Sequence, residues 1–298
     1  MKRLVLMIIP ALICGVLFTS CDSDETESKF TNGLWLKMGD NAIVSTSDID
    51  FYDVSTHMIY LKKELPYLKN VYSGGKMSVY VDHSKIYECS FHSLHSSSLP
   101  QGAFIMVPPI FYSEDIIRIS FMQIIDLNGK PQFTDPRSDK QIIAALKNNH
   151  LYHEGLHCEI QSVNYLSGKL ILNIELSNPD TFDYYYLDPD KMGIGLFHYF
   201  TNGPTFLDDQ YQRYNHKETV VHPESFKSWE KEWLTLIKSG ERKNISITYN
   251  HFDEIPTGTY RVNFAFPGLS WVSQKDRIFG NGRIWMGSIS IEKDVTFQ

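Results

Sequence analysis

The segment His153-Glu154-Gly155-Leu156-His157 has the H-E-x-x-H spacing that can bind zinc. On an α-helix, residues four positions apart lie on one face, so both imidazoles could reach one Zn²⁺ while Glu154 acts as a general base. Catalysis at such a centre also requires a third protein ligand and an open coordination position for water. His153, Glu154 and His157 are therefore the first residues to consider as a catalytic metal site.

The elements expected around this segment do not place it on a helix. An apolar stripe typical of a short helix begins after Ser138 and Gln141, which are spaced as a capping box, and ends near Asn148-Asn149. Gly155 lowers helix propensity by about 1 kcal/mol relative to alanine, and a period-two strand pattern starts at Leu156. In a strand, residues four positions apart are separated by about 13 Å, which is too far for them to share a metal ion.

A third ligand is also missing from the positions where the longer zinc-binding pattern would place it. That pattern continues with a glycine and a histidine, but Ile160 and Val163 occupy their positions. We therefore predict no metal site at His153 and His157 and no enzymatic activity. A zinc metallopeptidase that uses His153, Glu154 and His157 remains the alternative from another class. The sequence has no P-loop, no dinucleotide-binding glycine pattern and no Gly-x-Ser-x-Gly turn, so we expect no cofactor.

The first twenty residues have the layout of a secretory signal. Lys2 and Arg3 give a basic start, Leu4–Phe18 carry no charge, and the small residues Thr19-Ser20 precede Cys21. The apolar run is shorter than the roughly 20 residues that a permanent transmembrane helix needs. We therefore predict that residues 1–20 form a signal peptide that is removed.

Cys21 indicates the type of signal. The stretch Leu17-Phe18-Thr19-Ser20-Cys21 resembles the bacterial lipobox, which implies that Cys21 becomes the acylated first residue of a lipoprotein. Acyl chains such as palmitate contribute about 0.8 kcal/mol of membrane affinity per buried CH₂. The acidic run 22–28 is similar to the export signal of surface lipoproteins in the Bacteroidota, which implies an outer-membrane protein exposed at the cell surface. Such a run is also a solvated tether, which we place at residues 21–29.

Composition and cysteine usage narrow the function classes further. The 298-residue chain has a formal net charge of −7 and no basic cluster, so nucleic acid is not an expected partner. A hydrophobic content of 42% is enough for a packed core. Cys14 is removed with the signal, and Cys89 and Cys158 remain in a compartment where disulfides form. The sequence leaves open whether these two pair or stay separate core thiols.

Most of the mature chain has the period-two pattern of β-strands. The clearest runs are Met77-Val79-Val81 and Tyr87-Cys89-Phe91 around a turn at 82–85, then Ile117-Ile119-Phe121 and Leu170-Leu172-Ile174-Leu176. Segment 223–238 is ambiguous, because Phe226, Trp229, Trp233 and Ile237 share a helical face whereas 233–236 also fit a strand. We predict a helix there. The expected fold class is all-β, with two β-sandwich-like domains and one or two short helices.

The C-terminal half carries a more specific pattern. The order Gly240-Glu241, a strand at 245–249, then Pro256-Thr257-Gly258-Thr259-Tyr260 and a further strand is similar to immunoglobulin-like sandwiches of the intracellular proteinase-inhibitor-like family. The resemblance covers residues 156–298. It implies an immunoglobulin-like domain, and it adds a proteinase inhibitor to the alternative functions.

Three further groups of side chains could bind a ligand, and for each we prefer a structural interpretation. A cluster of histidines precedes a serine-rich loop, aromatic residues able to stack on sugar rings recur in the second half, and four aspartates crowd one loop where they could bind calcium. We predict solvated histidines, core aromatics and solvated aspartates. The groups are His83, His92 and His95; Tyr184, Tyr185, Tyr186, Trp229, Trp233, Trp271 and Trp285; and Asp180, Asp183, Asp188 and Asp190.

Together these observations predict a signal peptide at 1–20, a tether at 21–29, a β-rich domain at 30–152 and an immunoglobulin-like sandwich at 153–298. We expect a lipid-anchored envelope protein with a non-enzymatic binding or scaffolding role. Its expected partners are the membrane, through the anchor, and a protein or glycan ligand. Glycan binding at the cell surface is the alternative within the binding class.

Overall fold

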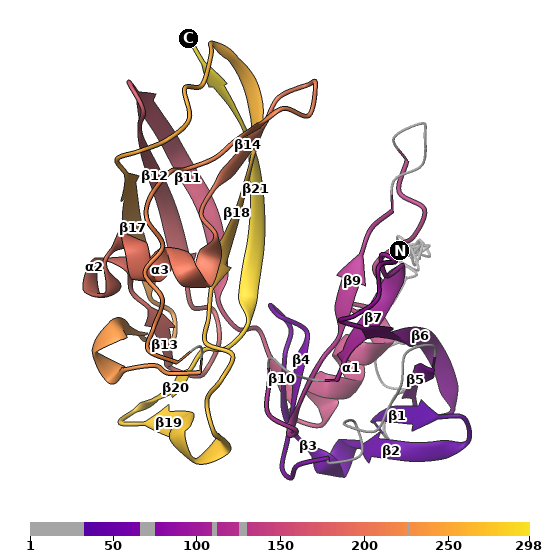
Figure 1. Ribbon diagram of the computed structural model, residues 1–298. Helices are drawn as coiled ribbons and strands as arrows, with labels where there is room; N and C mark the ends of the chain where they lie inside the picture. The colour runs from indigo at the N-terminus through magenta and orange to yellow at the C-terminus, as the bar shows by residue number, and fades with distance from the viewer. Residues whose placement is uncertain (1–32, 66–74, 109–111, 125–129, 226) are drawn as a thin grey trace, which may run out of the picture.

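The computed structural model describes residues 33–65, 75–108, 112–124, 130–225 and 227–298. The signal segment, Cys21 and the acidic run therefore lie outside the described residues. Within them, strands form five sheets and the helices are short, so the protein has an all-β, sandwich-like fold (Figure 1). No helix of the described part is long and apolar enough to span a membrane.

The N-terminal part contains two sheets and one helix, α1. The six-stranded sheet has the order β2-β1-β5-β6-β7-β9, and the four-stranded sheet has the order β10-β3-β4-β8. The elements are β1 (Leu34–Met38), β2 (Asn41–Ser45), β3 (Ile49–Asp53), β4 (Met58–Leu61), β5 (Lys76–Val81), β6 (Ser84–Ser93), β7 (Gly102–Val107), β8 (Ile116–Arg118), β9 (Ser120–Met122), α1 (Lys140–Asn148) and β10 (Tyr152–His153).

The predicted hairpin is confirmed as β5 and β6. The strands pair antiparallel, and Asp82 turns the chain between them with a φ of 54°. Met77, Val79, Cys89 and Phe91 are buried, as their alternation requires. The run Ile117-Ile119-Phe121 divides into β8 and β9, which belong to different sheets, so the chain crosses from one sheet to the other at Ile119.

The sheet formed by β10, β3, β4 and β8 is buried on both faces. Tyr52, Ile59 and Ile117 point into the N-terminal core together with the six-stranded sheet and α1. Their neighbours Phe51, Tyr60 and Ile116 point the other way and belong to the C-terminal core. Strand side chains alternate between faces, so this sheet serves both cores at once. Figure 1 shows β3 and β4 on the side of the N-terminal part that faces the C-terminal part.

Helix α1 lies where the sequence predicts it, but its cap is shifted by one residue. Asp139, rather than Ser138, is the N-cap, and its side chain accepts a hydrogen bond from the Gln141 backbone N–H. The helix ends at Asn148 and packs Ile142 and Leu146 into the N-terminal core. The chain then forms β10 and continues into the C-terminal part.

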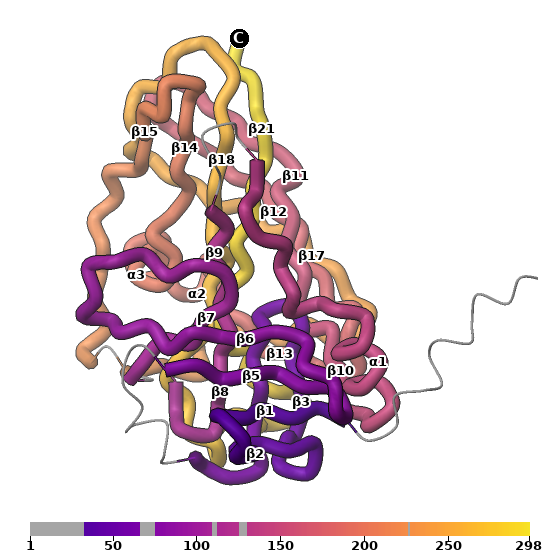
Figure 2. Tube along the Cα trace, turned by 90° about the vertical axis from the view of Figure 1, so that its right-hand side faces the viewer, coloured from indigo at the N-terminus to yellow at the C-terminus, as the bar shows by residue number. Residues whose placement is uncertain are grey.

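The C-terminal part contains three sheets, with the orders β11-β12-β17, β16-β13-β20-β19 and β15-β14-β18-β21. Its elements are β11 (His157–Leu166), β12 (Lys169–Ser177), β13 (Tyr184–Leu187), α2 (Pro189–Met192), α3 (Ile194–Thr201), β14 (Thr205–Leu207), β15 (Arg213–Tyr214), β16 (Leu234–Ile237), β17 (Arg242–Tyr249), β18 (Gly258–Pro267), β19 (Ile278–Phe279), β20 (Gly282–Ile284) and β21 (Ser288–Phe297). In Figure 2, β12, β18 and β21 run up the view, whereas β1, β5 and β6 run across it.

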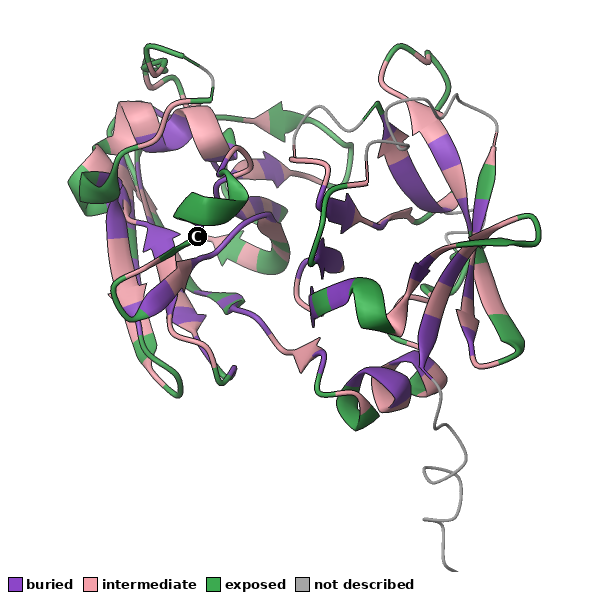
Figure 3. Ribbon diagram, turned by 90° about the horizontal axis from the view of Figure 1, so that it is seen from below, coloured by how far each residue is buried: buried purple, intermediate pink, exposed green. Residues whose placement is uncertain are grey.

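The C-terminal core lies between two facing strands, β12 and β18. Every apolar residue of the predicted run on β12 is at most 1% exposed, and the residues between them are partly exposed. β18 contributes Tyr260, Val262, Phe264 and Phe266 to the same core. This alternation is what a sheet with one buried face requires. In Figure 3, buried residues are purple and partly exposed residues pink, and both colours occur on the strands of the two parts. The division into two domains at residue 152 stays a prediction.

The helix predicted over 223–238 is wrong. Lys231–Trp233 form one 3₁₀ turn, and Leu234–Ile237 form β16, which pairs antiparallel with β13. The free edge of β13 satisfies the backbone groups of this segment and overrides its helical apolar spacing. The helices of the C-terminal part are instead α2 and α3. The N-cap Asp188 followed by Pro189 is the sequence signal for α2.

The two candidate disulfide cysteines are free and buried in different cores. Cys89 packs in the N-terminal core and Cys158 in the C-terminal core. The alternative in which Cys89 and Cys158 pair is therefore not realised. Burial raises the pKa of each thiol to about 12, so both behave as small apolar core groups.

Candidate functional site

The His153–His157 segment is extended, as its context predicts. His153 ends β10, Gly155 has a φ of +75°, and His157 begins β11. A Cβ atom at Gly155 would lie 2.4 Å from both Asp53 Oδ1 and Ser55 Oγ, so only glycine fits. The bend at Gly155 carries the chain from one core to the other.

The two histidines of the segment have separate partners. His153 is 11% exposed, and its Nδ1 lies 2.8 Å from Asp180 Oδ1. His157 is 50% exposed, and its Nε2 lies 3.8 Å from Glu154 Oε1. Among the described residues, no three His, Cys, Asp or Glu side chains are grouped so that they could hold a metal ion.

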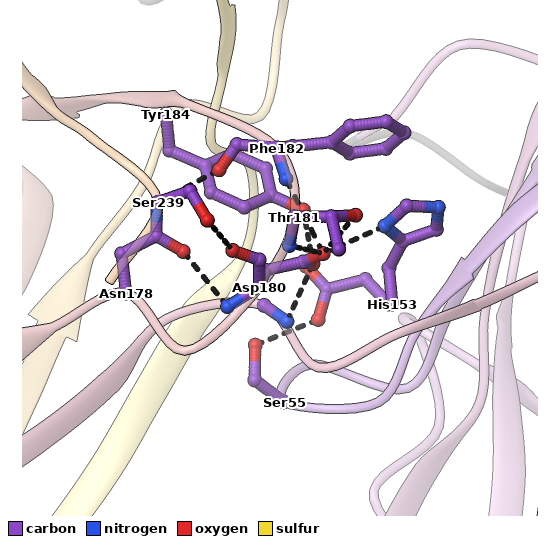
Figure 4. A network of polar contacts seen from close by, with 10 residues as sticks. Ser55, His153, Asn178, Asp180, Thr181, Phe182, Tyr184 and Ser239 are labelled. Atoms are coloured by element: carbon purple, nitrogen blue, oxygen red, sulfur yellow. Dashed lines mark hydrogen bonds and ion pairs between the residues drawn. The ribbon is translucent and has the colours of Figure 1, made fainter. Parts of the chain in front are cut away.

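Asp180 is the centre of the polar network in Figure 4. This carboxylate is 4% exposed and accepts hydrogen bonds from His153 Nδ1, the Gly155 backbone N–H and the Tyr184 hydroxyl. Burial alone would raise the pKa of Asp180, but these donors outweigh it and hold the pKa at about 2. The prediction that the aspartates of this loop are solvated is therefore wrong for Asp180. Its charge is stabilised inside the protein.

A second buried carboxylate, Asp53, lies on the opposite side of Gly155. It is 1% exposed and accepts hydrogen bonds from Ser55 Oγ and the Thr56 backbone N–H. Burial raises the pKa of Asp53 to about 6, and the charge of Asp180 adds to the rise. Paired carboxylates with separated pKa values can act as acid and base. Here both groups are closed off from solvent and lie where the two cores meet, so we assign them a structural place and not a catalytic one.

Aromatic rings and one guanidinium complete this contact. The His153 ring stacks on Phe182, with centroids 3.7 Å apart, and meets the edge of the Phe51 ring. The Arg283 guanidinium lies 4.6 Å from the centroids of both phenyl rings and 3.6 Å from Asp50 Oδ2. Residues of β3, β10, the β12–β13 loop and β20 therefore meet at this place. We name this cluster, formed by Asp53, His153, Gly155, Asp180 and Phe182, the joint.

A second ionic contact joins the same two parts of the chain. Arg277 and Asp115 are 5% and 0% exposed, and Arg277 Nη1 lies 2.5 Å from Asp115 Oδ2. The second guanidinium nitrogen donates to Asp115 Oδ1 and to the Ser113 hydroxyl. Burial raises the pKa of Asp115, but the hydrogen bonds from Arg277 and Ser113 lower it by more. With the joint, this pair holds the two cores in one arrangement.

A cavity also spans both parts, and none of the five residues of the joint lines it. It has a volume of ≈360 Å³, within the range of small-molecule sites. One wall comes from β7, β8 and the residues next to them, and the other from α3 and the loops around β18 and β21. The described lining residues are Phe104, Ile105, Met106, Val107, Tyr112, Ile116, Ile117, Arg118, Ser120, Phe200, Gly268, Ser270, Gly287 and Ser288. We name this cavity the interlayer pocket.

Arg118 is the one charged residue among the described lining residues. It is partly buried at the end of β8. Its Nη1 donates to the Tyr112 hydroxyl at 3.0 Å, and its Nη2 donates to Ser288 Oγ at 3.4 Å. The remaining lining is apolar or carries neutral hydroxyl groups. The pocket can therefore bind an apolar molecule and orient a polar end towards Arg118.

The remaining aromatic, histidine and aspartate side chains singled out in the sequence mostly pack or form local contacts in the structure. Of the aromatic set, Tyr184, Tyr186, Trp233 and Trp285 are buried in the C-terminal core, as predicted, whereas Tyr185, Trp229 and Trp271 are partly exposed. Of the histidines, His92 packs its edge on Phe104, His95 caps its turn through its backbone N–H and His83 is exposed. Asp183 accepts a hydrogen bond from the Ser239 backbone N–H, Asp188 accepts one from the Asp190 backbone N–H, and Asp190 is exposed.

The chain matches no protein-family model and no curated protein. The interlayer pocket and the joint are therefore inferred from the structure of this protein alone. Sequence reasoning missed the pocket, because its walls come from segments at least 80 residues apart (Ser120 and Phe200 are the nearest) and none of them has a motif of its own. The one local sign of the pocket in the sequence was Arg118, an arginine that follows two isoleucines at the end of β8. In the structure it is half-buried.

Proposed function

We propose that this protein is a lipid-anchored, surface-exposed binding protein of the bacterial envelope, and that the interlayer pocket is its binding site. The observation that carries the proposal is a cavity of ≈360 Å³ with an apolar lining and one guanidinium group. Small-molecule sites have this composition, with a mostly apolar wall and a few polar groups that fix the orientation. The pocket also lies between two parts that are joined by the buried pair Arg277–Asp115 and by the joint, which favours a preformed site.

The anchor is the second part of the proposal, and its support comes from the sequence. An uncharged run that follows Lys2 and Arg3 ends at the lipobox-like Cys21. The acidic run after Cys21 would hold the folded part away from the membrane as a solvated tether. A binding site held at the outer surface in this way would meet ligands from the medium.

The alternatives have weaker support. Glycan binding needs exposed aromatic platforms, but most of the aromatic candidates fill the core. A zinc metallopeptidase needs His153 and His157 on one metal ion, but His153 is bonded to Asp180. Proteinase inhibition rests on the resemblance of the C-terminal half, and no described surface feature adds to it.

The pocket is tested with a neutral apolar probe, methyl decanoate, by calorimetry on the mature chain without lipid. We expect the wild type to bind the probe. Ser270→Trp, which places an indole in the pocket, should abolish binding. Thr257→Trp, at an exposed position beyond the far end of β18, is the matched control and should bind as the wild type does. Equal binding by both tryptophan variants would mean that the probe binds elsewhere.

The anchor is tested separately in cells. Labelled palmitate should enter the wild type, and Cys21→Ser should abolish both labelling and membrane association. Cys14→Ser is the matched control, because Cys14 is expected to leave with the signal peptide. Full membrane association of the Cys21→Ser protein would contradict the anchor.

A further inference from the structure

Among the described residues, no acidic side chain forms an ion pair with Arg118. Its two bonding partners, Tyr112 and Ser288, are neutral hydroxyl groups. No acidic residue lines the interlayer pocket in the described part of the chain. By contrast, Arg277, which also lies between the two parts, has a buried carboxylate as its partner. A guanidinium at the wall of an apolar cavity attracts an anion.

The two neutral partners are oriented to help bind such an anion. Tyr112 and Ser288 both accept hydrogen bonds from Arg118, so each keeps its own hydroxyl proton. Those two protons and the remaining N–H groups of Arg118 are free to donate to a further acceptor. A carboxylate has two oxygens that accept several hydrogen bonds, and its planar shape fits the guanidinium fork. The polar end of the pocket therefore presents donors from three side chains.

The apolar part of the interlayer pocket limits the size of the ligand beyond its carboxylate. Phe104, Ile105, Ile117 and Phe200 line the cavity and offer no charge to a second polar group. The volume of ≈360 Å³ corresponds to about twelve water-sized units at ~30 Å³ each. A chain of roughly ten carbons with one carboxylate has the same number of non-hydrogen atoms.

We propose that the interlayer pocket binds a medium-chain monocarboxylate, with its carboxylate on Arg118, Tyr112 and Ser288 and its alkyl chain against the apolar wall. This inference rests on the proposed function, because it names the ligand class for the same pocket. It makes Arg118 the specificity-determining residue. The alkyl chain contributes affinity through burial, and the guanidinium selects the anion.

The test compares decanoate with methyl decanoate, which has the same alkyl chain and no charge. In the wild type at pH 7 we expect decanoate to bind about 10- to 100-fold more tightly, the range for hydrogen bonds to a charged group. Arg118→Met should remove this difference and keep the affinity for the ester. Arg213→Met, which removes an exposed arginine of β15 that does not line the pocket, is the matched control and should keep the preference.

Each outcome decides a different claim. Equal affinity of the wild type for acid and ester, with both lost in Ser270→Trp, would overturn the carboxylate and leave the pocket in place. A preference for decanoate that persists in Arg118→Met would also overturn it. Binding of neither ligand would overturn the pocket as a binding site. If Arg118→Met does not fold, Tyr112→Phe removes one donor without changing charge and should weaken decanoate alone.

Discussion

Asp53 and Asp180 are buried carboxylates that lie against the same residue, Gly155. Asp180 accepts a hydrogen bond from the Gly155 N–H at 2.9 Å, and Asp53 Oδ1 occupies the space that a side chain at Gly155 would need. Their pKa values are displaced in opposite directions, to about 6 for Asp53 and about 2 for Asp180. Burial raises the pKa of both carboxyls, but the bonds from His153 and Gly155 outweigh it at Asp180, whereas Asp53 has only neutral donors that do not.

The raised pKa of Asp53 predicts a loss of stability between pH 4 and pH 7. Its folded pKa of about 6 exceeds the ordinary aspartate value of 3.8, so its contribution to stability is full below pH 3.8 and is lost as the pH rises through 6. Asp53→Asn should therefore be more stable than the wild type at pH 7, by up to about 3 kcal/mol at 1.36 kcal/mol per pKa unit. Near pH 4 the two should be equal. Urea unfolding at both pH values measures this, and a constant difference would contradict it.

The contribution of Asp180 to stability depends on pH in the opposite direction, so it gives an internal check on the experiment with Asp53. Its depressed pKa means that its contribution is present above pH 3.8 and is lost as the pH falls through 2. The stabilisation from the two groups together is thus greatest near pH 4. His153 and the Gly155 backbone supply two of the hydrogen bonds to the ionised Asp180.

Gly155 cannot be replaced without displacing the joint. Gly155→Ala places a methyl group within 2.4 Å of Asp53 and Ser55 and also strains a positive φ, so we expect a loss of about 2 kcal/mol or more in unfolding free energy. Gly240→Ala is the matched control, with a φ of +76° and no atom within 4 Å of the new methyl group. Chemical denaturation of both variants separates steric contact from backbone strain. Equal losses would show that the joint is not tightly packed.

Some elements of the fold follow from the sequence because their signals are local. The alternation of Leu170, Leu172, Ile174 and Leu176 predicts one buried face, and the structure has it. Segment 234–237 illustrates the opposite case. Its apolar spacing suits a helix, but an unpaired edge of β13, which lies about 50 residues away in sequence, draws it into a sheet. No window around 223–238 contains that information.

The site was less predictable than the fold. The context of His153 and His157 excluded a helix, but the partner of His153 is Asp180, on a loop that we expected to be solvated. The interlayer pocket combines residues near 105, 118, 200 and 288. Such a cavity is set by how layers pack, and single-strand patterns do not encode it.

The register of β12 can be tested by two neighbouring substitutions. Leu172 is fully buried, so Leu172→Asp places a charge in the core and should cost about 3 kcal/mol or more or prevent folding. Asn173 is half-buried on the other face and loses only its bond to Ser162 in Asn173→Asp, so a cost near 1 kcal/mol is expected. Thermal unfolding compares them. Similar shifts in Tm would be inconsistent with the register.

The ion pair between Arg277 and Asp115 should couple the two layers. Asp115→Asn leaves a guanidinium that is 5% exposed without its counter-charge and should cost about 3–5 kcal/mol. Arg277→Met should cost a similar amount, and the double variant should cost much less than the sum of the two. A double-mutant cycle on unfolding free energies measures the coupling. Additive losses would show that Arg277 and Asp115 do not stabilise the protein as an interacting pair.

The central claim is that the interlayer pocket binds its ligand, and methyl NMR tests it most directly. With isoleucine methyl groups labelled, decanoate should shift the signal of Ile116 most, because this lining residue points towards the C-terminal part, whereas the lining residues Ile105 and Ile117 pack into the N-terminal core. The signals of Ile174 and Ile247, in the C-terminal core away from the pocket, should stay in place. Saturable shifts confined to the lining isoleucines, and absent in Ser270→Trp, are the predicted result. Unchanged lining signals at saturating decanoate, or shifts that persist in Ser270→Trp, would contradict the account.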